Sequence, residues 1–249
     1  AFAFNTNDDI NNMTFYRYKL INRAIQTIDS TYFAMWTDPD LGCTTDDYIG
    51  CDTSRNLMYT YNQDAVDGEP GTTCALSGDP TYGTEVPMVG IDYFRGPLGP
   101  KVFNDDSVLV NPGLGQPADT VVELGMSSFA YYNNGGLQGT SPEEATTDPE
   151  GAIEFYRYLS GSWKDGTPIS FGGSGYNVGA PAEARIPYVF TDPPNNNNGW
   201  SMCTADLEFN DRRTIQASGP FRLDPGKVNE LIVGVVWVPD IDHPCPSLT

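Results

Sequence analysis

One short acidic segment, residues 38–52, carries most of the residue types that could do chemistry. Its sequence is DPDLGCTTDDYIGCD, with five carboxylates, two glycines and two cysteines but no Lys or Arg. Carboxylates this close repel one another unless a cation lies between them. Oxygen ligands at flexible spacing suit Ca²⁺ better than a transition metal. We therefore expect a Ca²⁺ site whose ligands are Asp38, Asp40, Asp46, Asp47 and Asp52.

The same segment has a simpler interpretation as a solvated loop. Asp side chains often accept hydrogen bonds from their own backbone in Asx turns and otherwise face water. The spacing is not that of an EF-hand, which needs D-x-D-x-D-G and a Glu at the twelfth position. Residues 62–67 hold a second, weaker group of acidic and amide side chains, for which we favour the solvated interpretation.

The cysteines bear on the same segment, because Cys43 and Cys51 bracket its acidic centre. A disulfide between them would lock the loop if their Cα atoms come within about 7 Å. The chain has five cysteines, so at least one has no partner within it. Zinc is a poor fit, because there is no C-x-x-C and His243 is the only histidine.

Catalytic patterns are weak, and we expect no enzyme. A Ser-His-Asp or Cys-His site would have to use His243, which Pro244 follows, and no G-x-S-x-G elbow is present. A glycoside hydrolase needs only two facing carboxylates about 5–9.5 Å apart, which sequence alone does not exclude. It remains a less favoured alternative.

Composition excludes several partners. The formal net charge is −20, from 33 acidic and 13 basic residues. Phosphate contacts need Lys and Arg, so we expect neither nucleic acid nor anionic membrane surfaces as partners. No stretch approaches the roughly 20 apolar residues of a membrane helix, so we expect no membrane insertion. Bound cations would relieve the self-repulsion of such a charged chain.

The elements that must position the acidic segment look like β-strands. Aromatic and β-branched runs flank it at residues 31–36 and 57–61, so we expect a loop between two strands. Residues 227–238 are apolar on both faces, which indicates a central strand. Further strands are expected at residues 14–21, 88–94, 107–110, 121–132, 167–171 and 186–190.

Together these patterns predict an all-β fold, a β-sandwich of jelly-roll or Ig-like type with long loops and one short helix. The helix is expected at residues 148–159, with Asp148 as N-cap and Pro149 at its first position. We expect one domain over residues 1–249, with a subdomain junction near 111–118 as an alternative. The strongest core strand lies late in the chain and needs partners from earlier segments.

Two further groups of residues have competing interpretations. The motif Asp211-Arg-Arg213 could recognise a carboxylate ligand, but internal ion pairing is favoured because so few cations serve so many acids. Tyrosines could form a sugar-stacking platform, although strand and helix alternation places about half of such a set in the core. These tyrosines are Tyr16, Tyr18, Tyr59, Tyr61, Tyr131, Tyr132, Tyr156 and Tyr158.

Several motifs in combination resemble a β-rich region of large secreted or cell-surface proteins of Bacteroidota that use type IX secretion. The motifs span residues 36–42, 46–52, 59–62, 90–97, 154–159, 163–168, 211–213 and 218–221. The resemblance implies export, a bacterial cell surface and a fragment of a longer protein, and no reaction. It also implies O-glycosylation at Asp-Ser/Thr-aliphatic tripeptides, for which Ser107 and Thr120 are candidates.

The sequence therefore favours a non-catalytic extracellular module that calcium stabilises. A carbohydrate- or protein-binding adhesin module is the first alternative, with contacts from exposed tyrosines and long loops. A self-assembling surface fibre is the second, because exposed edge strands can pair between chains and an unpaired cysteine could crosslink them.

Overall fold

The computed structural model describes residues 1–68, 74, 78, 80–100, 121–134, 142–205, 207, 210–239 and 241–245. Strands make up 41% and helices 11% of the structure, and the strands form antiparallel sheets in a sandwich-like arrangement. The predicted all-β sandwich class is therefore confirmed. Ser107, Thr120, the strand expected at 107–110 and the junction near 111–118 all lie outside the described residues.

The larger sheet has six strands in the order β1-β2-β11-β6-β5-β4. Its pairings are all antiparallel, and β11 lies centrally between β2 and β6, as its two apolar faces predicted. The strands are β1 (Phe2–Ala3), β2 (Met13–Ile21), β4 (Asp47–Asp52), β5 (Leu57–Asn62), β6 (Met88–Arg95) and β11 (Val228–Val238).

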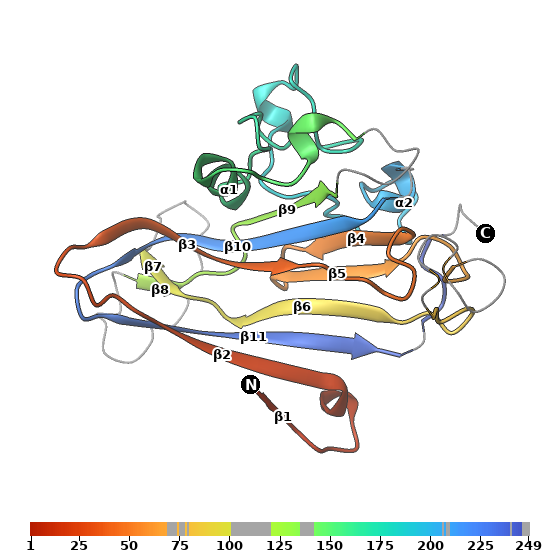
Figure 1. The fold of residues 1–249 in the computed structure, drawn as a ribbon, viewed down its shortest axis with the longest axis horizontal. Helices are drawn as coiled ribbons and strands as arrows, with labels where there is room; N and C mark the ends of the chain where they lie inside the picture. Colours follow the sequence, from red (N-terminus) through yellow and green to blue (C-terminus); the bar gives the residue numbers. More distant parts are fainter. Residues whose placement is uncertain are drawn as a thin grey trace.

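The smaller sheet packs on the larger one and has the order β3-β10-β9 (Figure 1). Its strands are β3 (Ile28–Thr37), β10 (Arg212–Leu223) and β9 (Ser128–Asn133). A separate pair joins β7 (Leu98–Pro100) to β8 (Val121–Glu123). Strands β9 and β10 are antiparallel, and Asn133, the last residue of β9, pairs with Arg212, the first residue of β10.

The two sheets are held together by a shared aromatic core. Tyr93 of β6 donates its hydroxyl to the backbone oxygen of Gln216 on β10 at 2.8 Å. The Phe33 ring of β3 contacts the rings of Tyr18 and Tyr93 at centroid distances of 5.2 and 6.1 Å. Burial of such rings supplies much of the free energy of folding, and the buried hydroxyl keeps a partner.

One irregular segment, Pro187 to Phe190, joins the two sheets at their edge. The Val189 N–H donates to Phe129 on β9, and the Cys51 N–H of β4 donates to Phe190, both at 3.1 Å. We predicted strands at 167–171 and 186–190, but these residues form only isolated bridges. Ile169, Val189 and Phe190 are buried although their backbone is irregular, and burial alone does not distinguish a strand from such a segment.

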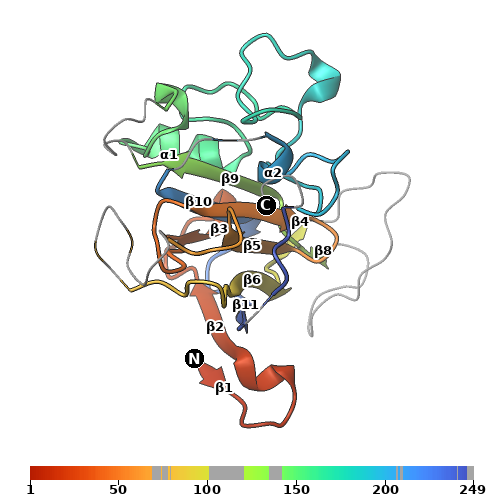
Figure 2. The same cartoon turned by 90° about the vertical axis from the view of Figure 1, so that its right-hand side faces the viewer.

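Residues 142–205 cover the smaller sheet and are mostly irregular (Figure 2). They include α1 (Ala152–Leu159), α2 (Met202–Ala205), η2 (Glu144–Thr146) and η3 (Ala182–Ala184), while η1 (Asp9–Asn12) precedes β2. The helix predicted near residue 150 exists, but Gly151 is its N-cap and Asp148 lies before it. In the described part of the chain, no helix is both long enough and apolar enough to cross a membrane.

Candidate functional site

The acidic segment is tied down by a disulfide different from the predicted one. Cys43 bonds to Cys74, Cys203 bonds to Cys245, and Cys51 remains a buried free thiol. The predicted Cys43–Cys51 bond is wrong because Cys51 lies within β4, where its thiol faces the Val189 carbonyl at 3.3 Å. The loop is therefore linked through Cys43 to Cys74, which lies outside the acidic segment.

The five predicted calcium ligands do not form one cluster. Asp52 ends β4 and organises the β4–β5 turn, where it accepts hydrogen bonds from the Ser54 hydroxyl at 2.6 Å and the Ser54 N–H at 2.9 Å. It also forms an ion pair with Arg55. Burial alone would raise the pKa of Asp52, but the bonds from Ser54 and Arg55 hold it below its ordinary value. The Asp52 carboxylate therefore stabilises the β4–β5 turn and lies outside the cluster of three carboxylates described below.

Asp46 and Asp47 also turn inward and hold the loop from inside. The Asp46 carboxylate accepts from the Gly68 N–H, and that of Asp47 from the Leu41 N–H, both at 2.9 Å. In each of them the other oxygen, Oδ1, is buried and has no hydrogen-bond partner. Burial raises the pKa of Asp46 to about 6 and that of Asp47 well above its ordinary value.

Asp67, which the sequence placed in a solvated group, is fully buried and is central to this loop. Its carboxylate accepts from the Cys43 N–H at 2.9 Å and from the Tyr82 N–H at 2.6 Å. A Cβ at Gly42 would overlap this carboxylate, and Gly42 has a φ of +81°. Glycine is therefore required at position 42 on both grounds.

Three carboxylates lie close enough together to hold a metal ion. Oxygens of Asp38, Asp40 and Asp211 lie within 4.8 Å of one another, and no other acidic, His or Cys group of the described residues does so. We call this the outer triad. Asp38 and Asp40 follow β3, and Asp211 precedes β10, so the β3–β10 pairing of Thr37 with Thr214 brings them together.

Asp211 is the member of the outer triad that the sequence did not identify as a ligand. Its Oδ2 accepts from the Asn134 amide at 2.7 Å, whereas its Oδ1 is buried and has no hydrogen-bond partner. A buried carboxylate oxygen without a donor is costly, and a cation would satisfy it. The sequence singled out Asp211 only as part of the Asp211-Arg-Arg213 motif, because its place beside Asp38 and Asp40 depends on knowing that β10 pairs with β3.

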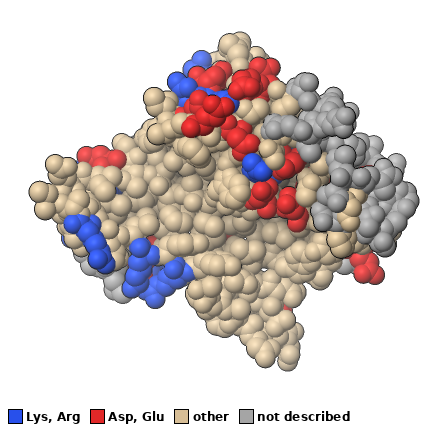
Figure 3. Space-filling model, in the orientation of Figure 1, with Lys and Arg blue, Asp and Glu red and all other residues tan. Residues whose placement is uncertain are grey.

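Arg213 supplies a positive charge beside the outer triad. Its guanidinium lies 3.3 Å from Asp38, 3.0 Å from Asp148 and 4.0 Å from Asp211. Internal ion pairing, the favoured interpretation of the Asp211-Arg-Arg213 motif, is thus confirmed for Arg213. Burial raises the pKa of Asp38, and the neighbouring Arg213 opposes that shift. Acidic side chains gather on the upper half of the face in Figure 3, among few basic ones.

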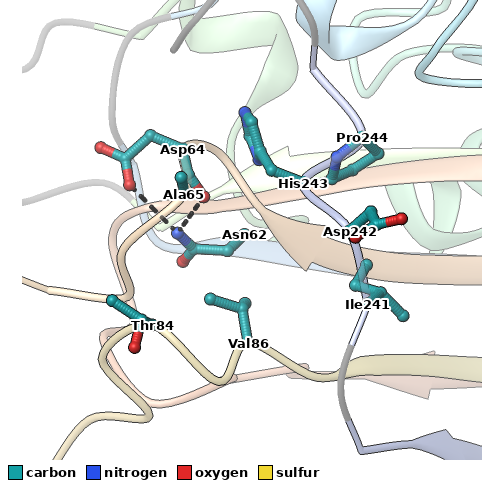
Figure 4. Close-up of a pocket in the computed structure, with 9 residues that line it drawn as sticks. All are labelled: Asn62, Asp64, Ala65, Thr84, Val86, Ile241, Asp242, His243 and Pro244. Carbon is teal, nitrogen blue, oxygen red and sulfur yellow. Dashed lines mark hydrogen bonds between the residues drawn. The ribbon is translucent and has the colours of Figure 1, made fainter.

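A pocket of about 260 Å³ lies beside the buried part of the loop (Figure 4). Asn62 and Asp64 line one side, and Asp242 and His243 line the other. Burial lowers the pKa of His243, and its Nε2 has no hydrogen-bond partner. Thr84 is the hydroxyl side chain among the described residues that line this pocket, and no hydrogen bond between it and His243 is seen there.

The predicted tyrosines do not form one exposed platform. Tyr61, Tyr131, Tyr132 and Tyr158 are buried. A single tyrosine of the set, Tyr59 on β5, lines a second pocket among the described residues.

Comparisons with known proteins give no family to set beside this geometry. Protein-family models, curated proteins and solved structures were all searched, and none matches the chain.

Proposed function

We propose that this chain is a non-catalytic extracellular β-sandwich module that Ca²⁺ stabilises at the outer triad. The observation that carries the proposal is the convergence of Asp38, Asp40 and Asp211 within 4.8 Å, with a buried Asp211 oxygen that lacks a donor. Carboxylate oxygens are the preferred ligands of Ca²⁺, and backbone oxygens or water can complete its shell.

Local charge supports a bound cation. Asp38, Asp148 and Asp211 surround Arg213, and Asp40 belongs to the same group. One guanidinium therefore serves three carboxylates, which leaves an excess of negative charge around Arg213. A divalent cation would reduce that excess and join the ends of β3 and β10.

Two disulfides and the concentration of Ca²⁺ outside cells support an extracellular location. Two disulfides are in keeping with an oxidising compartment, since they are rare in cytosolic proteins. Millimolar Ca²⁺ outside cells allows even a site with few protein ligands to be occupied. In this role the module is a building block of a secreted or surface protein.

The test is a thermal melt of the purified protein in excess CaCl₂ and in EGTA, with elemental analysis of the protein. Binding to the folded state alone raises stability by about 2.7 kcal/mol at a hundredfold excess over Kd. Asp211→Asn should abolish the Ca²⁺-dependent shift while its amide oxygen still accepts from Asn134. Asp9→Asn, at an exposed position, is the matched control and should keep the full shift. Equal melting in both conditions, with no metal found, would remove the proposal.

A further inference from the structure

A pocket of about 380 Å³ lies against β4 and β5, away from the outer triad. Leu57 and Tyr59 of β5 line it together with Met88, Pro193 and Pro194, so its surface is largely apolar. Asp52 and Arg55 of the β4–β5 turn add one acid and one base. This combination of apolar lining and few polar groups is typical of small-molecule sites.

The Tyr59 ring occupies the space that a side chain at position 50 would fill. Gly50 lies directly opposite it on β4, and a Cβ at Gly50 would come within 2.6 Å of the Tyr59 Cζ atom. The ring therefore lies across the backbone of β4, where any larger residue would displace it. The side chain remains partly exposed and lines the pocket, so the ring offers a flat surface at little entropic cost.

The polar end of the pocket offers an acceptor and donors side by side. Asp52 Oδ1 already accepts from the Ser54 hydroxyl, the Ser54 N–H and the Arg55 N–H, whereas Oδ2 pairs only with Nη1 of Arg55, whose side chain is 74% exposed, so Oδ2 is the oxygen that a ligand hydroxyl can reach. A guanidinium carries five N–H donors, and this pair engages one nitrogen of the three. Vicinal hydroxyls of a sugar both donate and accept, so one hydroxyl can bond the carboxylate while its neighbour accepts from Arg55.

We propose that this pocket binds a neutral pyranose, with the C–H face of the sugar ring on Tyr59 and two adjacent hydroxyls on Asp52 and Arg55. A sugar matches both halves of the pocket, because one face of the ring is apolar and its edge is polar. The charges of Asp52 and Arg55 cancel, and the chain as a whole carries −20. An acidic sugar would therefore meet net repulsion, which favours an uncharged ligand.

This inference goes beyond the structural role of calcium and depends on different residues. None of the pocket residues named above belongs to the outer triad. Sugar binding at a temperature well below the melt should therefore be the same in CaCl₂ and in EGTA. Either proposal can fail while the other holds.

The experiment is a glycan array of neutral and acidic oligosaccharides, followed by isothermal titration with the neutral oligosaccharide that binds best. Tyr59→Ala and Arg55→Ala should each weaken its binding about tenfold or more, which corresponds to about 1.4 kcal/mol. Tyr156→Ala is the matched control, because this tyrosine is 46% exposed on α1 and should leave binding unchanged.

Three outcomes would overturn the proposal: no neutral glycan is retained, only acidic glycans bind, or both pocket variants bind like the wild type. Melting curves show whether each variant folds. If Tyr59→Ala does not fold, Arg55→Ala decides, because its side chain lies at the surface. Gly50→Ala gives a second check, since the added methyl group should displace the ring and weaken binding without removing it.

Discussion

Asp47 and Asn62 lie directly opposite one another on β4 and β5, and each has a buried side-chain oxygen that accepts no hydrogen bond. Side chains opposite one another on antiparallel strands have Cβ atoms about 4.5–5.5 Å apart. Two acceptors at such a position lack a donor between them. A proton on the Asp47 carboxyl would supply one, and burial raises the pKa of Asp47 in that direction.

The variant Asp47→Asn tests this relationship. The amide that it introduces can donate to Asn62 while its oxygen still accepts from the Leu41 N–H, so no proton has to be taken up. We expect the free energy of unfolding at pH 7 to rise by about 1–3 kcal/mol, measured by urea titration. The reverse variant, Asn62→Asp, adds a second acid and should destabilise the fold. A loss of stability in Asp47→Asn would contradict this account.

The pH dependence of stability follows from the same burial. Burial raises the pKa values of Asp46 and Asp92 to about 6, so their folded forms hold protons that the unfolded chain, at about 3.9, has released. That stability is present below the unfolded pKa and is lost as pH rises through about 6. In EGTA at constant ionic strength, the melting temperature should fall between pH 4.5 and 7.

The substitution Asp92→Asn measures how much one partly buried carboxyl group contributes to this fall in melting temperature with pH. Asp92→Asn removes one of the carboxyl groups whose pKa burial raises, and it should flatten the fall in melting temperature. Carboxylates with lowered pKa values, such as Asp52 and Glu230, act in the opposite sense but mostly below pH 4. A melting temperature that stays constant or rises from pH 4.5 to 7 would show that these buried acids do not control stability.

Arg213 should influence both stability and cation binding. Arg213→Gln removes the ion pairs to Asp38 and Asp148, and we expect it to lower the free energy of unfolding by about 1–3 kcal/mol. It should also tighten Ca²⁺ binding, measured by titration calorimetry, because a competing positive charge has gone. Arg17→Gln is the control, since Arg17 is 53% exposed and such pairs contribute about 1 kcal/mol or less. Weaker Ca²⁺ binding in Arg213→Gln would place the cation elsewhere.

The cysteine pairing can be checked covalently. Peptide mapping under non-reducing conditions should show Cys43 bonded to Cys74 and Cys203 bonded to Cys245. Cys51 is 1% exposed and should react with a thiol reagent only after unfolding. Replacing Cys43 and Cys74 together by serine should cost about 2–5 kcal/mol. A reactive thiol in the native protein would contradict the burial of Cys51.

The strands that the sequence predicted are those that alternate clearly or are apolar throughout, such as β2, β6 and β11. Strand β4 lies inside the acidic segment, where Asp and Gly disfavour strands in isolation and tertiary pairing with β5 prevails. Strand β10 begins with two arginines and contains Gly219-Pro220, a pattern typical of a turn.

The site was predictable only in part, for a related reason. Local acidity predicts Asp38 and Asp40 as ligands, and both belong to the outer triad. Local acidity does not say which carboxylates turn inward, as Asp46 and Asp47 do to bind backbone N–H groups. Asp211 joins the triad through the β3–β10 pairing, and sequence spacing carries no information on such long-range contacts.

The pairing of Asn133 with Arg212 has a consequence for how this fold can change. The chain leaves this strand pair after Asn133 and rejoins it at Arg212 on the same rung, and the described residues between them pair with β9 only at isolated bridges. That excursion also supplies core side chains such as Trp163 and Phe190 and the Cys203 half of a disulfide, so exchanging it for a short hairpin turn would keep the β9–β10 pairing but expose the core. Such an exchange would also remove the Pro187 to Phe190 link, whose backbone hydrogen bonds connect β9 of the smaller sheet to β4 of the larger one.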